Sequence, residues 1–141
     1  TGEEEIYTGF DQSDLYREKQ AKWLEEIMQS ELYQKAKYRV VMMHIPPFYS
    51  FDQKGSRHCK QVFSPLFDRY KVDLVIAGHT HTYGVHPPVK DQHNYPIVIG
   101  GGPLAGNRTL IKVNANNQAL QLQMLKDDGS IVGEYKIEAE R

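Results

Sequence analysis

The sequence is poor in cysteine, in long apolar runs and in surplus charge, and each shortage excludes a class of protein. A single cysteine, Cys59, excludes an internal disulfide framework and any zinc site built from several cysteines. No stretch of the 141 residues approaches the run of about 18 apolar residues that a membrane-spanning helix needs. The 17 basic and 18 acidic residues give a formal net charge of −1, so no nucleic-acid partner is expected. The length and the mixed composition are those of one ordinary globular domain.

The N-terminus also lacks features that a complete exported chain would show. Its first residues have neither the positive charge nor the apolar run of a signal peptide, and the chain does not begin with Met. We therefore expect the chain to begin inside a longer gene product. Residues 1–12 are acidic and polar and are expected to form a loop.

Helical and strand patterns alternate in the first half of the chain. Apolar residues three or four apart over residues 14–32 predict one amphipathic helix, with Ser13 as its N-cap. The continuous apolar runs at residues 39–43 and 72–77 predict two strands that are buried on both faces.

The segment between these two runs completes a βαβ unit. Residues 48–57 are expected to form a loop, and the apolar residues from Cys59 to Tyr70 have helical spacing. Pro65 is expected to begin a new helical turn, as proline does at the first position of a helix. Strand, helix and strand in this order predict two parallel neighbouring strands.

The last third of the chain is expected to be an antiparallel meander that follows a strand at residues 96–99. Asn-rich and Asp-Gly breaks separate its three strands, as in hairpins, and its apolar residues tend to alternate, so one face is half exposed. The three strands are expected at residues 109–113, 119–125 and 131–137. The predicted fold class is α/β (α+β), a βαβ unit followed by a meander.

Both buried strands of the βαβ unit end in histidine. His44 follows the first strand, His79 follows the second, and His81 comes two residues later. Because ligands bind beyond the carboxyl ends of parallel strands, the three imidazoles are expected to converge on one crevice. Imidazole suits Zn, Fe, Mn and Co, so a metal site is favoured over three separate structural histidines.

The other three histidines are weaker candidates. His58 is expected in the loop before the second helix, exposed to solvent. His86 and His93 lie in a polar connector, where they either support the metal ligands from behind or are simply exposed.

Two ordered motifs resemble those of the calcineurin-like metallophosphoesterases. Val41–Pro47 resembles their V-x-x-H block, and Gly78–His81 is similar to their G-H-x-H block. The extension Thr82-Tyr83 and the helical segment 16–24 resemble the purple acid phosphatase branch. The resemblance covers the chain from Ser13 to about Gly102, and two blocks in order make it specific.

This resemblance implies a hydrolase of small-molecule phosphoesters with two metal ions (Fe, Zn or Mn) on a β-sandwich flanked by helices. By position, His44 and His79 would bind one ion and His81 the other. Tyr83 would lie near the substrate mouth, although simple packing on its loop is an equal alternative. Family analogy implies a secreted or periplasmic protein.

The family's other ligand blocks, an Asp motif, G-D-x-x-[DY] and G-N-H-[DE], do not occur in the chain. Residues 1–141 are therefore expected to be the C-terminal portion of one catalytic domain: loop 1–12, an α-β-α-β segment 13–81 with the histidines, and a connector and meander 82–141. Alone, this portion is expected to be inactive and to self-associate through the apolar face or strand edge that it leaves open.

Two alternatives remain open. The chain could be a complete, non-catalytic binding module whose histidines are structural or hold a single ion. A hydrolase with one zinc ion on three histidines is less favoured, because no general base is evident beside them.

Overall fold

The fold was obtained as a computed structural model, which describes residues 12–51 and 53–141. The helices are α2 (Gln12–Gln29), α3 (Glu31–Lys35) and α4 (Lys54–Arg69). The strands are β1 (Val40–Met42), β2 (Leu74–Ala77), β3 (Gly84–His86), β4 (Ile97–Ile99), β5 (Thr109–Ala115), β6 (Ala119–Lys126) and β7 (Ile131–Glu138). None of the helices in these described ranges is long and apolar enough to cross a membrane.

A four-stranded sheet in the order β1-β2-β4-β3 forms the centre of the molecule. Strands β1, β2 and β4 run parallel, so the predicted βαβ unit is confirmed, while β3 pairs antiparallel to β4. The short strand β3 was not predicted, because three residues inside a polar connector carry no usable periodicity.

The predicted meander is confirmed as a second, antiparallel sheet in the order β5-β6-β7. Leu120, Leu122 and Met124 alternate along β6, and all are buried against Leu74 and Val98 of the first sheet. The two sheets therefore share one apolar core, which makes the meander an integral layer of the fold.

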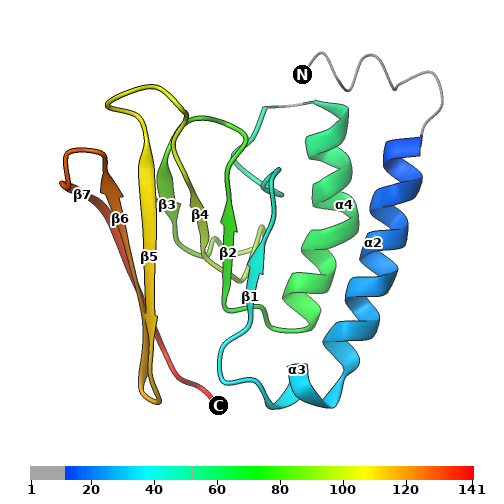
Figure 1. The fold of residues 1–141 in the computed structure, drawn as a ribbon. Helices are drawn as coiled ribbons and strands as arrows, with labels where there is room; N and C mark the ends of the chain where they lie inside the picture. Colours follow the sequence, from blue (N-terminus) through cyan, green and yellow to red (C-terminus); the bar gives the residue numbers. More distant parts are fainter. Residues whose placement is uncertain (1–11, 52) are drawn as a thin grey trace.

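Helices α2 and α4 cover the opposite face of the first sheet. Their residues Met28, Phe63 and Phe67 form a second core cluster with Val75 and Ile97 of that sheet. The molecule thus has three layers, helices, mixed sheet and meander (Figure 1). This arrangement confirms the mixed α/β class.

Two details of the helices differ from the prediction. The expected helix at 14–32 ends at Gln29, and Ser30 accepts a 3.3 Å hydrogen bond from the Tyr33 amide to cap the separate helix α3. Ser13 lies inside α2 and is not its N-cap. Spacing alone missed the break because apolar residues recur at helical intervals on both sides of Ser30.

The second helix also begins earlier than predicted and does not restart at Pro65. α4 runs without interruption from Lys54 to Arg69, so the expected loop 48–57 gives way to helix at Lys54. Phe63 and Phe67 on either side of Pro65 are both buried against the sheet. This packing holds the helix together across the backbone hydrogen bond that proline cannot make.

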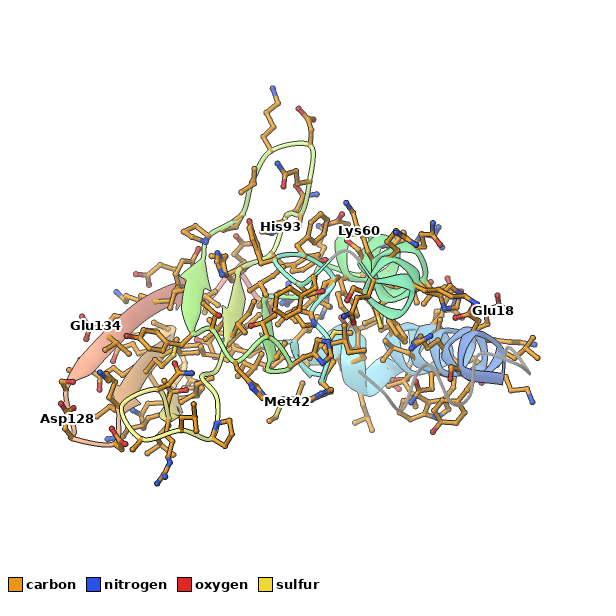
Figure 2. All side chains as sticks on the ribbon, turned by 90° about the horizontal axis from the view of Figure 1, so that it is seen from above. Glu18, Met42, Lys60, His93, Asp128 and Glu134 are labelled. Carbon is orange, nitrogen blue, oxygen red and sulfur yellow. The ribbon has the colours of Figure 1, made fainter. Side chains whose placement is uncertain are left out.

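Strand β1 is the clearest departure from the prediction of strands buried on both faces. It is the edge strand of its sheet among the described residues, and Val40 and Met42 are 41% and 79% exposed. Figure 2, viewed from above, shows Met42 at one margin of the sheet layer and His93 at the other. An apolar run predicts a strand, but whether that strand is buried depends on the elements that pack beside it.

An open apolar groove of about 370 Å³ lies beside this edge, between β1 and helices α2 and α4. Trp23 of α2 lines it together with Met42, and Trp23 is 59% exposed. The apolar residues of α2 therefore do not form one buried stripe as predicted.

Candidate metal centre

The ends of β1 and β2 bring His44 and His79 to the same edge of the sheet. The parallel register pairs Met42 with Ile76, and the Met43 amide donates to the Ile76 carbonyl at 3.0 Å. The Gly78 amide then donates to the His44 carbonyl at 3.1 Å, which continues the pairing beyond the strands. Adjacent parallel strands thus deliver the two histidines side by side.

The two imidazoles face each other through ring nitrogens. His44 Nε2 and His79 Nδ1 lie 3.2 Å apart, and the rings meet edge to face with their centroids 5.0 Å apart. Two nitrogens bound to one zinc-type ion at about 2.1 Å in tetrahedral geometry would lie about 3.4 Å apart. The pair therefore fits two ligand positions of a single metal ion.

An unusual backbone presents the histidines that follow β2. His79 and His81 have φ angles of 67° and 57°, in the left-handed region that non-glycine residues rarely occupy. Thr80 between them is buried, and its Oγ1 accepts from the Thr82 amide at 3.2 Å. Strained residues of this kind cluster at functional sites, where the surrounding structure holds them.

His81 is exposed and is not grouped with the first pair. Within residues 12–51 and 53–141, no three His, Cys, Asp or Glu side chains are positioned together to hold a metal ion. The structure thus brings together two of the three predicted ligands, and binding of a second ion by His81 stays a prediction. No carboxylate joins the pair in this part of the chain.

Tyr83 is half-buried and packs against the core between the two sheets. This contact agrees with the alternative that Tyr83 serves packing. A place near the substrate remains a prediction for this residue.

The three remaining histidines are tied into the fold. His58 lies in α4 and not in a loop, with its side chain 14% exposed and its Nδ1 3.2 Å from Asp14 Oδ1. His93 is 1% exposed, so exposure in the connector is wrong for it. His86 stacks on Tyr49 with 3.8 Å between the ring centroids. Burial, and secondly the nearby His93, lowers the pKa of His86.

One polar residue beside the histidines was missed in the sequence. Asn107, in the loop between β4 and β5, donates from Nδ2 to the His81 carbonyl at 2.6 Å. The triple glycine at residues 100–102, directly after a buried strand, was the available signal that the backbone approaches another segment closely there.

Comparison with known proteins identifies the family of this fold and its motifs. The model of the calcineurin-like phosphoesterases matches residues 3–83, more than half of the chain. The chain belongs to the calcineurin-like phosphoesterase family. Members of this family are metal-dependent phosphoesterases, and the family implies a centre with two metal ions.

Similar proteins point to the purple acid phosphatase branch of the calcineurin-like phosphoesterases. A purple acid phosphatase from Glycine max is 30% identical over 110 residues, which cover 64% of this chain and 24% of that protein. Purple acid phosphatase 5 of Arabidopsis thaliana is 29% identical over 107 residues, 62% of this chain and 27% of that protein. The chain therefore spans about a quarter of the length of these relatives.

Solved structures show the same calcineurin-like fold. The yellow lupin (Lupinus luteus) purple acid phosphatase PPD1 has a TM-score of 0.65 at 18% identity, covering 84% of this chain and 28% of that one. GAP50, the anchor in the inner membrane complex of Plasmodium, has a TM-score of 0.62 at 17% identity, covering 84% and 42%.

Proposed function

We propose that the whole protein is a metal-dependent phosphoester hydrolase of the purple acid phosphatase type, acting on small-molecule phosphoesters. The observation that carries the proposal is the 3.2 Å approach of His44 Nε2 to His79 Nδ1 at the edge where two parallel strands end. In this proposal His44 and His79 bind one metal ion, and His81 binds the second.

The residues of this chain would hold and orient the reacting groups. Two metal ions, when bound, would lower the pKa of a water molecule and neutralise the charge that grows on the phosphoryl group. The facing ring nitrogens of His44 and His79 follow two strands of a rigid parallel ladder, so they can act as fixed ligands. Tyr83 is the proposed side chain nearest the substrate mouth.

We further propose that residues 1–141 are the C-terminal portion of one catalytic domain, in which upstream blocks supply the carboxylate ligands. Two observations support this division: the chain spans about a quarter of its relatives, and β1 has an open edge beside an apolar groove. Reading the gene upstream of Thr1 tests it, because an open frame with G-D and G-N-H-[DE] blocks is expected. A protein of this type is expected to be secreted or periplasmic.

A substitution in the whole protein tests the ligand assignment. The unchanged protein should hydrolyse a chromogenic aryl phosphate only when metal is present, and His79→Ala should abolish this activity and release metal. His86→Ala is the matched control, since His86 pairs with Ile97 at the far end of β4, while His79 follows the strand end where Ala77 pairs with Ile99. Undiminished activity in His79→Ala would show that the assignment is wrong.

A non-catalytic binding module is the second candidate. It is favoured by the occurrence of the same fold in a protein described as an anchor. Absence of the upstream ligand blocks from the gene, with no hydrolysis by the whole protein, would favour this candidate.

A further inference from the structure

We propose that Asn107 is a positioning residue that holds the backbone of His81 in the conformation needed to present its imidazole to a metal ion. This inference rests on the proposed function, in which His81 is the ligand of the second ion. It adds a role for the loop between β4 and β5, which carries none of the predicted ligands.

His81 has a backbone conformation that is rare outside glycine. Its φ angle of 57° lies in the left-handed region, which is unfavourable for a non-glycine residue. His81 is also exposed, so side-chain packing does not hold it there. A specific contact is needed to keep this backbone in place.

Asn107 supplies that contact. Its Nδ2 donates to the His81 carbonyl at 2.6 Å, across 26 residues of sequence. A backbone carbonyl only accepts hydrogen bonds, so the amide nitrogen and not the amide oxygen must face it. The bond therefore fixes both the orientation of Asn107 and the carbonyl of a left-handed residue.

The glycines at 101 and 102 allow the loop to come this close. A Cβ on Gly101 would lie 1.7 Å from the Asn107 carbonyl oxygen, and a Cβ on Gly102 would lie 2.8 Å from the Cβ of His81. Any larger residue would push the loop away from His81. The two glycines therefore let the loop backbone lie directly against Asn107 and His81.

The loop is itself anchored to rigid elements. The Gly100 amide donates to the Ala77 carbonyl at the end of β2, and the Gly101 amide donates to Thr109 Oγ1 at the start of β5, both at 2.8 Å. Through its bond to Asn107, the position of the His81 carbonyl therefore depends on both sheets. Partners that orient a metal ligand from behind typically contribute 10–100-fold to metal affinity.

The test measures Zn²⁺ binding to the whole protein by chelator competition, which resolves the two sites. Asn107→Ala should weaken one site by 10–100-fold and leave the other, on His44 and His79, unchanged. Asn107→Asp keeps the size and shape of the side chain but replaces the donor with an oxygen, so it should produce the same selective loss.

Asn116→Ala provides the matched control. Asn116 likewise uses its side-chain amide to hold backbone, but its Oδ1 accepts from the amides of Gln118 and Ala119 in the turn at the opposite end of β5. This variant should lower the melting temperature by an amount comparable to Asn107→Ala without changing either Zn²⁺ affinity.

His81→Ala distinguishes a failure of the positioning role of Asn107 from a failure of the proposed function. If His81→Ala weakens the second site and the Asn107 variants do not, the positioning role is wrong and the proposed function stands. If the Asn107 variants weaken both sites equally, together with a loss of stability, Asn107 is merely structural and the inference is also wrong. If His81→Ala leaves both sites intact, the ligand assignment in the proposed function fails.

Discussion

Contacts at the ring nitrogens distinguish His93, which is committed to the fold, from His44 and His79, which are proposed to bind a metal ion. His93 is buried and uses both nitrogens, with Nδ1 2.7 Å from the Tyr95 carbonyl and Nε2 2.8 Å from the Tyr49 hydroxyl. Because a carbonyl only accepts, Nδ1 carries the proton and the Tyr49 hydroxyl donates to Nε2. His44 and His79, in contrast, face each other through ring nitrogens 3.2 Å apart.

The surroundings of His86 predict a pH dependence of stability. Burial lowers its folded pKa, so the folded state favours the neutral ring and the unfolded chain binds the proton more readily. The free energy of unfolding is therefore undiminished by His86 above the ordinary pKa of about 6.5. It decreases as the pH falls below that value and through the lowered folded pKa. Urea unfolding between pH 7.5 and 5 should show this loss.

His86→Phe is the variant that isolates this effect. It keeps a ring stacked on Tyr49 but cannot titrate, so its free energy of unfolding should fall less steeply on acidification. An identical pH slope in the variant and the unchanged protein would contradict the role of His86.

Sequence reasoning reached the residues of the candidate site that follow strands, and missed the one that supports them from a distance. His44 and His79 were predictable because an apolar run that forms a strand ends just before each of them. Asn107 was not, since its contact with His81 depends on where the loop after β4 crosses the sheet edge. Left-handed backbone at a histidine likewise leaves no mark in the sequence.

At the scale of elements, the sequence predicts what a segment forms better than what covers it. The apolar run of β1 predicted the strand correctly, but its burial was wrong because, among the described residues, β1 is an edge strand that only β2 flanks. For β2 the apolar run predicted both the strand and its burial correctly, since the helices pack on Val75 and the meander packs on Leu74. Burial is a property of the assembly of elements, and periodicity within one element cannot report it.

The open edge of β1 predicts the behaviour of the isolated 141-residue chain. An exposed apolar strand edge with unpaired backbone groups recruits another chain, so light scattering should show self-association at micromolar concentration. Met42→Lys, which places a charge on a residue that is 79% exposed at that edge, should shift the chain toward the monomer.

Leu32→Lys is the control for this prediction. Leu32 is 87% exposed on helix α3 and belongs to no strand, and its replacement should leave the self-association unchanged. A clean monomer of the unchanged chain would contradict both the open edge as an association site and the proposed half-domain.

At the scale of the whole molecule, the three layers meet at the edge that carries the histidines. The helical layer and the meander each bury one face of the central sheet, so β2 is held from both sides and its carboxyl end is fixed (Figure 1). The loop from β4 into the meander then returns to the same edge at His81. The meander thus contributes to the candidate site as well as to the core.

Metal binding should therefore stabilise the chain as a whole. An ion that binds only the folded state raises the free energy of unfolding by about 2.7 kcal/mol at 100 times its Kd, because the unfolded chain does not hold the two imidazoles together. Titration with Zn²⁺ up to millimolar concentration should raise the melting temperature of the chain, and His44→Ala or His79→Ala should each remove most of the increase. His86→Ala should retain it, since its ring stacks on Tyr49 and not on the candidate ligands. No increase at millimolar Zn²⁺ would instead indicate that the paired histidines are purely structural.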